Sequence, residues 1–93
     1  MERRRLSTDE IHKEIQGMPD WAVEGNSLKR TRKFADFAES LAFVNKVGAL
    51  AEEADHHPDI TFGWGYANIA LTTHDRGGIT DVDIALAKRI EAI

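Results

Sequence analysis

The side chains best suited to chemistry in this sequence are two adjacent histidines, His56 and His57. Imidazole has an ordinary pKa of about 6.5, so it can both donate and accept a proton near neutral pH. Pro58 biases His57 towards an extended backbone, which predicts that a helix ends at or just before this pair. His74 is a third candidate, because it ends a predicted strand beside Gly77-Gly78, a loop that can approach a ligand closely.

Three interpretations of the histidine pair follow from its spacing. Glu52 lies four residues before His56, so one helical turn is expected to bring its carboxylate beside that ring and orient it. A metal site is disfavoured, because the i, i+4 spacing of H-E-x-x-H is absent and adjacent side chains diverge. A structural role as helix C-caps stays open beside proton transfer or substrate binding. His12, among charged residues of a predicted helix, is expected to face solvent.

Composition limits the classes of protein that remain. A chain of 93 residues predicts a single domain spanning residues 1–93, and 42% hydrophobic residues are enough for one core. The absence of cysteine excludes disulfides and thiolate chemistry, so packing, helped by self-association, must stabilise the fold. A net charge of -4 gives no general attraction to nucleic acid or anionic lipid, and no stretch approaches the roughly 20 apolar residues of a membrane span. Residues 1–5 are basic but no apolar run follows, which predicts a frayed, solvated end and a cytoplasmic protein.

The first third of the chain predicts a helix and a hairpin. The helix is expected over Ser7–Gln16, with Ser7 as N-cap and Glu10 completing a capping box. Residues 21–24 and 28–34 then alternate between apolar and polar on either side of the turn signal Gly25-Asn26, which indicates two paired strands.

The longest helical pattern runs from Asp36, an expected N-cap, to Ala54. Two adjoining apolar stripes give this helix so wide an apolar face that we expect it to pack against a sheet. Gly48 is about 1 kcal/mol worse than alanine inside a helix, so we expect it to mark a close helix–sheet or helix–helix approach. The stripes contain Phe37, Leu41, Val44, Gly48 and Ala51, and Phe43, Val47, Leu50 and Ala54.

Two further strands and a helix complete the domain. Residues 60–64 and 66–73 alternate about a turn near Gly65, and Thr80 is the expected N-cap of a last helix. The predicted order is α-β-β-α-β-β-α. It indicates an α+β fold with a four-stranded antiparallel sheet and helices packed on one face.

Three motifs, in their order and spacing, resemble those of the pterin-4a-carbinolamine dehydratase family. They are Glu52-x-x-Asp55-His56-His57-Pro58-Asp59-Ile60, Leu71-Thr72-Thr73-His74-Asp75 and Gly77-Gly78-Ile79-Thr80-x-x-Asp83. The resemblance covers about Trp21 to Ile93 and implies the same α+β fold.

The resemblance implies dehydration of 4a-hydroxytetrahydrobiopterin to quinonoid dihydropterin and water, which recycles the cofactor of aromatic amino acid hydroxylases. It implies acid–base catalysis without a metal or a redox cofactor. The residues implied as catalytic are His56, His57 and His74. Those implied to contact the pterin are His56, His57, Pro58, Thr73, His74, Asp75 and Arg76, and the supporting acidic residues are Glu52 and Asp83.

Two other functions stay open. The domain could be a dimerisation or coactivator module that binds a transcription factor or partner enzyme, or it could act on a molybdopterin-related pterin. A homodimer or homotetramer is expected in either case, because the core is small and the apolar strand 60–64 is expected near a sheet edge. An aromatic amino acid hydroxylase is the partner that the resemblance implies.

Overall fold

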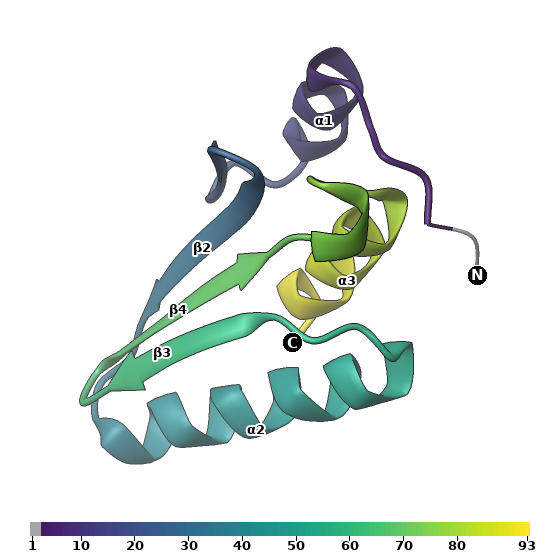
Figure 1. Cartoon of the computed structure of the whole chain (residues 1–93). Coiled ribbons are helices and arrows are strands. Elements are labelled where there is room, and N and C mark those ends of the chain that lie inside the picture. Colours follow the sequence, from purple (N-terminus) through teal and green to yellow (C-terminus); the bar gives the residue numbers. More distant parts are fainter. Residues whose placement is uncertain (1–2) are drawn as a thin grey trace.

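The computed structural model of the protein describes residues 3–93, which form one α+β unit (Figure 1). The element order is α-β-β-α-β-β-α with a short 3-10 helix before the last helix, which confirms the predicted order. The elements are α1 (Thr8–Ile15), β1 (Trp21–Glu24), β2 (Ser27–Lys33), α2 (Phe37–Ala54), β3 (Asp59–Gly63), β4 (Tyr66–Leu71), η1 (His74–Arg76) and α3 (Asp81–Glu91).

The four strands form one antiparallel sheet in the order β1-β2-β4-β3. Gly25 and Gly65 occupy the two hairpin turns with φ of 59° and 80°, a region that glycine enters without steric cost. Leu28 and Ile69 are buried beneath the helices, whereas Lys29 lies exposed on the opposite face. The helices therefore cover one face of the sheet, as predicted, and β3 lies at one edge.

The hydrophobic core lies between the sheet and helices α2 and α3 (Figure 1). Its most completely buried large side chains come from the two central strands and from both helices, so four elements contribute to one cluster. They are Leu28, Val47, Ile69, Leu71, Leu86 and Ile90. Within residues 3–93, no helix has both the length and the apolar character needed to cross a membrane.

Local capping signals set the helix starts. Ser7 Oγ accepts the backbone N–H of Glu10, and the Glu10 carboxylate accepts the N–H of Ser7, which is the predicted capping box. The Asp36 carboxylate accepts the N–H of Glu39 at the start of α2, with N···O 2.9 Å.

Helix α2 differs from its prediction in which residues meet the sheet. Its buried residues are Ser40, Phe43, Val47 and Ala51, whereas Leu41 is 39% exposed. The expected packing of Leu41 on the sheet is therefore wrong, because the helix carries apolar side chains on an outward face as well. The close approach expected at Gly48 is also absent, since an added Cβ there would meet nothing within 4 Å.

The segment Arg3–Leu6, which we call the strap, is held along the start of α3. The Leu6 N–H donates to the Ile79 carbonyl at 2.9 Å, and the Asp81 N–H donates to the Arg4 carbonyl at 3.1 Å. The prediction of a frayed end is therefore wrong for the strap; residues 1–2 lie outside the described part of the chain.

Candidate active site

A cavity of about 280 Å³ lies where the end of α2 meets the segment that follows β4. The structure brings all three predicted catalytic histidines to its wall, although they come from segments well separated in the sequence. The lining residues are Arg3, Asp55, His56, His57, Thr72, Thr73, His74 and Asp75.

The end of α2 determines where the histidine pair points. Asp55 has φ 51° and ψ 43°, a left-handed conformation that aspartate tolerates better than most residues. The N–H of His56 donates to the Ala51 carbonyl at 3.1 Å, which closes the last turn. This reversal of the chain buries His56 and leaves His57 at the surface.

The His56 ring is fixed by a buried carboxylate. Its Nε2 contacts Asp83 Oδ1, and the two residues are 5% and 0% exposed. The second carboxylate oxygen, Oδ2, accepts hydrogen bonds from Thr73 Oγ1 and from the Thr80 N–H, each at 2.9 Å. Asp83 thus ties the histidine junction, the end of β4 and the start of α3 together, and its buried oxygens are satisfied as buried polar atoms normally are.

The His57 ring is oriented by Glu52, whose Oε1 lies 2.8 Å from His57 Nε2. Both side chains are exposed. The expectation that Glu52 would orient His56 is therefore wrong. Spacing of i, i+4 pairs side chains only while the helix continues, and the left-handed Asp55 interrupts it before His56.

The third ring, His74, lies at the start of η1 in a tight turn. Thr73 and Gly78 form an isolated antiparallel bridge, and Gly77 ends η1 with φ 71°. The His74 side chain is exposed and forms no hydrogen bond with any of residues 3–93. It is therefore available to a ligand in the cavity.

Some predicted pterin contacts lie in the cavity wall and others do not. Thr73 and Asp75 line it, whereas Pro58 and Arg76 do not. Sequence reasoning missed Arg3, Asp55 and Thr72. Asp55 and Thr72 stand inside the motifs that carry the two histidine segments, which is a signal that marks them, but no local pattern connects Arg3 with Asp55, 52 positions away.

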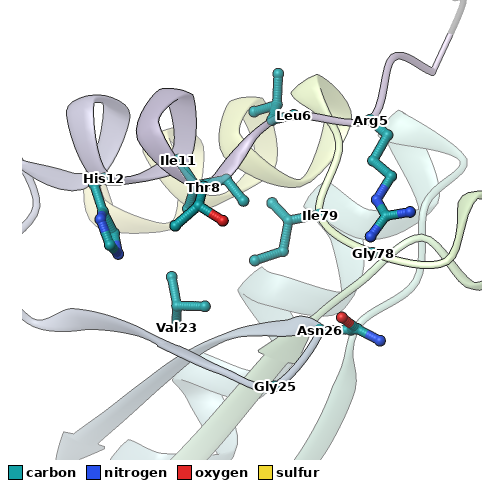
Figure 2. Close-up of a pocket in the computed structure, with 10 residues that line it drawn as sticks. All are labelled: Arg5, Leu6, Thr8, Ile11, His12, Val23, Gly25, Asn26, Gly78 and Ile79. Carbon is teal, nitrogen blue, oxygen red and sulfur yellow. The ribbon is translucent and has the colours of Figure 1, made fainter.

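A second, smaller cavity of about 100 Å³ lies between α1 and the β1–β2 turn (Figure 2). Its polar lining includes Arg5, Thr8, His12 and Asn26, and its apolar lining consists of Leu6, Ile11, Val23 and Ile79. It contains one imidazole and no carboxylate, so it lacks the paired groups that proton transfer requires. Among residues 3–93, no group of three His, Cys, Asp or Glu side chains is arranged to hold a metal ion.

Comparison with known proteins gives relatives over nearly the whole chain. A protein of Thermomicrobium roseum, provisionally named a pterin-4-alpha-carbinolamine dehydratase, is 49% identical over 86 residues, 92% of each chain. A protein of Sulfurisphaera tokodaii with the same provisional name is 41% identical over 90 residues, 97% of each chain.

Two solved structures are similar in fold. One is described as a transcriptional coactivator/pterin dehydratase from Brucella melitensis. It has a TM-score of 0.89 and 30% identity, and the match covers 96% of this chain and 97% of that one. The other is described as a pterin dehydratase-like protein identified as a RuBisCO assembly factor in the alpha-carboxysome. It has a TM-score of 0.63 and 32% identity, and the match covers 77% of this chain and 83% of that one.

The sequence profile of one family matches residues 4–93, and its description is pterin 4 alpha carbinolamine dehydratase. The match includes every residue placed in the cavity wall except Arg3. Together with the relatives, it shows that this chain belongs to the pterin 4 alpha carbinolamine dehydratase family.

Proposed function

We propose that this protein dehydrates a pterin 4a-carbinolamine by histidine acid–base catalysis in the cavity at the end of α2. The single observation that carries the proposal is the meeting of three imidazoles at one cavity: two are held by carboxylates and the third is unbonded to residues 3–93. Family membership supplies the substrate class.

The reaction needs one proton donor and one proton acceptor. An acid protonates the 4a-hydroxyl, the adjacent ring nitrogen supplies its electron pair to carbon 4a, and the C–O bond breaks to release water. The nitrogen, now doubly bonded to carbon 4a, loses its own proton to a base. A protonated and a neutral imidazole on either side of the substrate can perform both transfers, each worth typically 10²–10⁴-fold in rate.

The geometry favours different roles for the three rings. His56 is buried with Nε2 on Asp83, which suits a ring that orients the substrate and shapes the wall. His57 and His74 are exposed, so we assign the two proton transfers to them. The contact with Glu52 fixes which nitrogen of His57 faces the carboxylate and leaves Nδ1 available.

The test is stopped-flow dehydration of chemically generated 4a-hydroxytetrahydropterin. We expect His57→Ala and His74→Ala each to lower kcat/KM by at least about tenfold. His12→Ala is the matched control, since His12 lies outside the cavity and should retain the wild-type rate. The wild-type rate should be bell-shaped in pH, and chelators should not change it.

Retention of wild-type kcat/KM by both variants would mean that the cavity is not the site of reaction.

The source of the substrate is also part of the proposal: a hydroxylase that uses a tetrahydropterin, such as an aromatic amino acid hydroxylase, would release the 4a-carbinolamine. Membership of the family supports this source.

A second function, binding to a protein partner or to another copy of this chain, is favoured by exposed apolar side chains. Phe37, Leu41 and Trp64 are 45%, 39% and 72% exposed. They lie close together, because the Gly65 N–H donates to Ser40 Oγ and so holds the β3–β4 turn against the first turns of α2. We propose a homodimer or a pair of dimers that buries this surface, which we call the α2 patch. The Brucella melitensis relative described as a coactivator supports the partner-binding alternative.

A further inference from the structure

The strap reaches the histidine cavity from the opposite end of the chain. Arg3 is partly buried and lines the cavity together with His56, His57 and His74. Figure 1 shows the segment that leads into α1 lying beside the start of α3. Arg3 therefore adds a cationic side chain to a wall built otherwise from residues of two later segments.

Arg3 is bonded to both of those segments. Its guanidinium Nη2 donates to the Asp55 carbonyl at 2.7 Å, directly before His56 and His57. Its own carbonyl accepts from Arg76 Nε at 3.0 Å, in the turn that carries His74. One residue thus connects the histidine pair, through its side chain, with the third histidine, through its backbone.

We propose that Arg3 is a positioning residue of the dehydratase site, which sets the separation between the His56–His57 junction and His74. The inference rests on the proposed function and assigns Arg3 no proton transfer. Its role is to hold acid and base at the spacing the substrate requires.

The C-terminal end of α2 lacks a cation of its own, and Arg3 supplies one. A helix C-terminus leaves carbonyls without partners and carries a partial negative charge, which cations stabilise. The last turn of α2 contains no basic residue, whereas Glu52 and Glu53 add negative charge there. The Arg3 guanidinium supplies the missing donor and the missing charge at the left-handed Asp55, on which the direction of both histidines depends.

The strap is also anchored firmly enough to act as a support. Arg5 forms an antiparallel bridge with Thr80, three residues before Asp83. The Arg5 side chain runs along Gly78 (Figure 2), where an added Cβ would lie 3.2 Å from Arg5 Nε. Gly78 therefore leaves the space that the Arg5 side chain occupies. Thr80, which pairs with Arg5, also donates its N–H to Asp83, so the strap is anchored beside the residue that holds His56.

The test compares Arg3→Ala, Arg3→Lys and Arg4→Ala in the stopped-flow assay, well below the unfolding temperature of each variant. A displacement of about 1 Å can lower a rate by about 10²-fold, so we expect Arg3→Ala to lower kcat/KM by about 10- to 100-fold, mainly through kcat. Arg3→Lys should recover most of the loss, because an ammonium can still donate to the Asp55 carbonyl. Arg4→Ala should stay within about twofold of wild type, since the Arg4 side chain pairs outward with Glu10.

A double-mutant cycle with Arg76→Ala distinguishes a link shared by Arg3 and Arg76 from general destabilisation of the fold. If Arg3 and Arg76 act through one link, the double variant should lose little more activity than Arg3→Ala alone. Additive losses, or wild-type kcat/KM in Arg3→Ala, would overturn the inference while leaving the proposed function intact. An inactive wild type would instead overturn the proposed function, so the two failures are distinguishable.

Discussion

Asp83 is the residue on which the candidate site depends most. It is completely buried, and its two carboxylate oxygens face a histidine, a threonine hydroxyl and a backbone N–H from three different segments. A buried acceptor of this kind has no water to replace a lost partner, so its removal leaves donors unpaired. The same residue therefore supports both the fold and the orientation of His56.

We expect Asp83→Asn to lower the free energy of unfolding by about 2–4 kcal/mol. Both carboxylate oxygens accept hydrogen bonds, whereas the amide nitrogen of asparagine is a donor and would face a donor of the buried network. Urea denaturation measures the change. Asp75→Asn is the control: Asp75 lines the same cavity but is exposed, so its loss should lie within about 0.5 kcal/mol. Equal effects of the two substitutions would contradict the buried network.

At the scale of the elements, helix α2 has one apolar face that packs against the sheet and another that lies exposed. A leucine on the exposed face can therefore be compared with a buried leucine of the neighbouring helix α3. Leu86 of α3 is 1% exposed, whereas Leu41 of α2 lies in the exposed α2 patch. Leu86→Ala should lower the free energy of unfolding by about 2–5 kcal/mol, the range for a buried leucine. Leu41→Ala should lower it by about 1 kcal/mol or less at protein concentrations too low for self-association.

The end of α3 is attached to the sheet through Glu91. Its Oε1 accepts from Arg30 Nε at 2.7 Å and from Trp21 Nε1 at 2.9 Å. Burial would raise the pKa of Glu91, but the hydrogen bonds from Arg30 and Trp21 outweigh it, so the pKa lies below its ordinary value of 4.5.

A lowered folded-state pKa means that the Glu91 contacts stabilise the fold above the ordinary pKa and that this stability is lost as the pH falls through the folded value. Glu91→Gln should therefore lower the free energy of unfolding by about 1–3 kcal/mol near pH 7. The difference from wild type should shrink below about pH 4.5. Urea midpoints across that range measure it, with the exposed Glu24→Gln as control. A difference that does not depend on pH would refute the role of the ionised carboxylate.

Elements with local signals were predictable, and relations between distant elements were not. Ser7 and Glu10 determine the start of α1 through contacts three residues apart. The apolar period of α2 showed which residues share a face but not which of two apolar faces meets the sheet, so Leu41 was misplaced. The partner of Glu52 depended on a single left-handed residue, Asp55.

The candidate site was predictable only where residue type and motif spacing were sufficient. The three histidines line one cavity, and the motifs mark the two segments that carry them. Arg3 was missed, since a basic residue near the start of a chain has no periodicity that separates it from a solvated end.

For the whole molecule, the α2 patch and the free edge of β3 favour self-association. We expect sedimentation at micromolar concentration to show a species heavier than the 10.4 kDa chain. Trp64→Ala combined with Leu41→Ala should shift the protein towards the monomer, whereas Ile93→Ala, an exposed apolar residue elsewhere, should not. A wild-type monomer at all concentrations would exclude the proposed assembly.

The strap also has a consequence for the order in which the molecule forms. Arg3 and Arg76 are 73 positions apart, and Arg3 and Asp55 are 52 apart, so both contacts close long loops whose entropy cost rises with length. On a ribosome, the strap is synthesised before Ile79–Asp81 and has no backbone partner until those residues follow. We therefore expect a nascent chain to complete its hairpins before its cavity wall, because Arg3 can join the three histidines there only once Ile79–Asp81 have been synthesised.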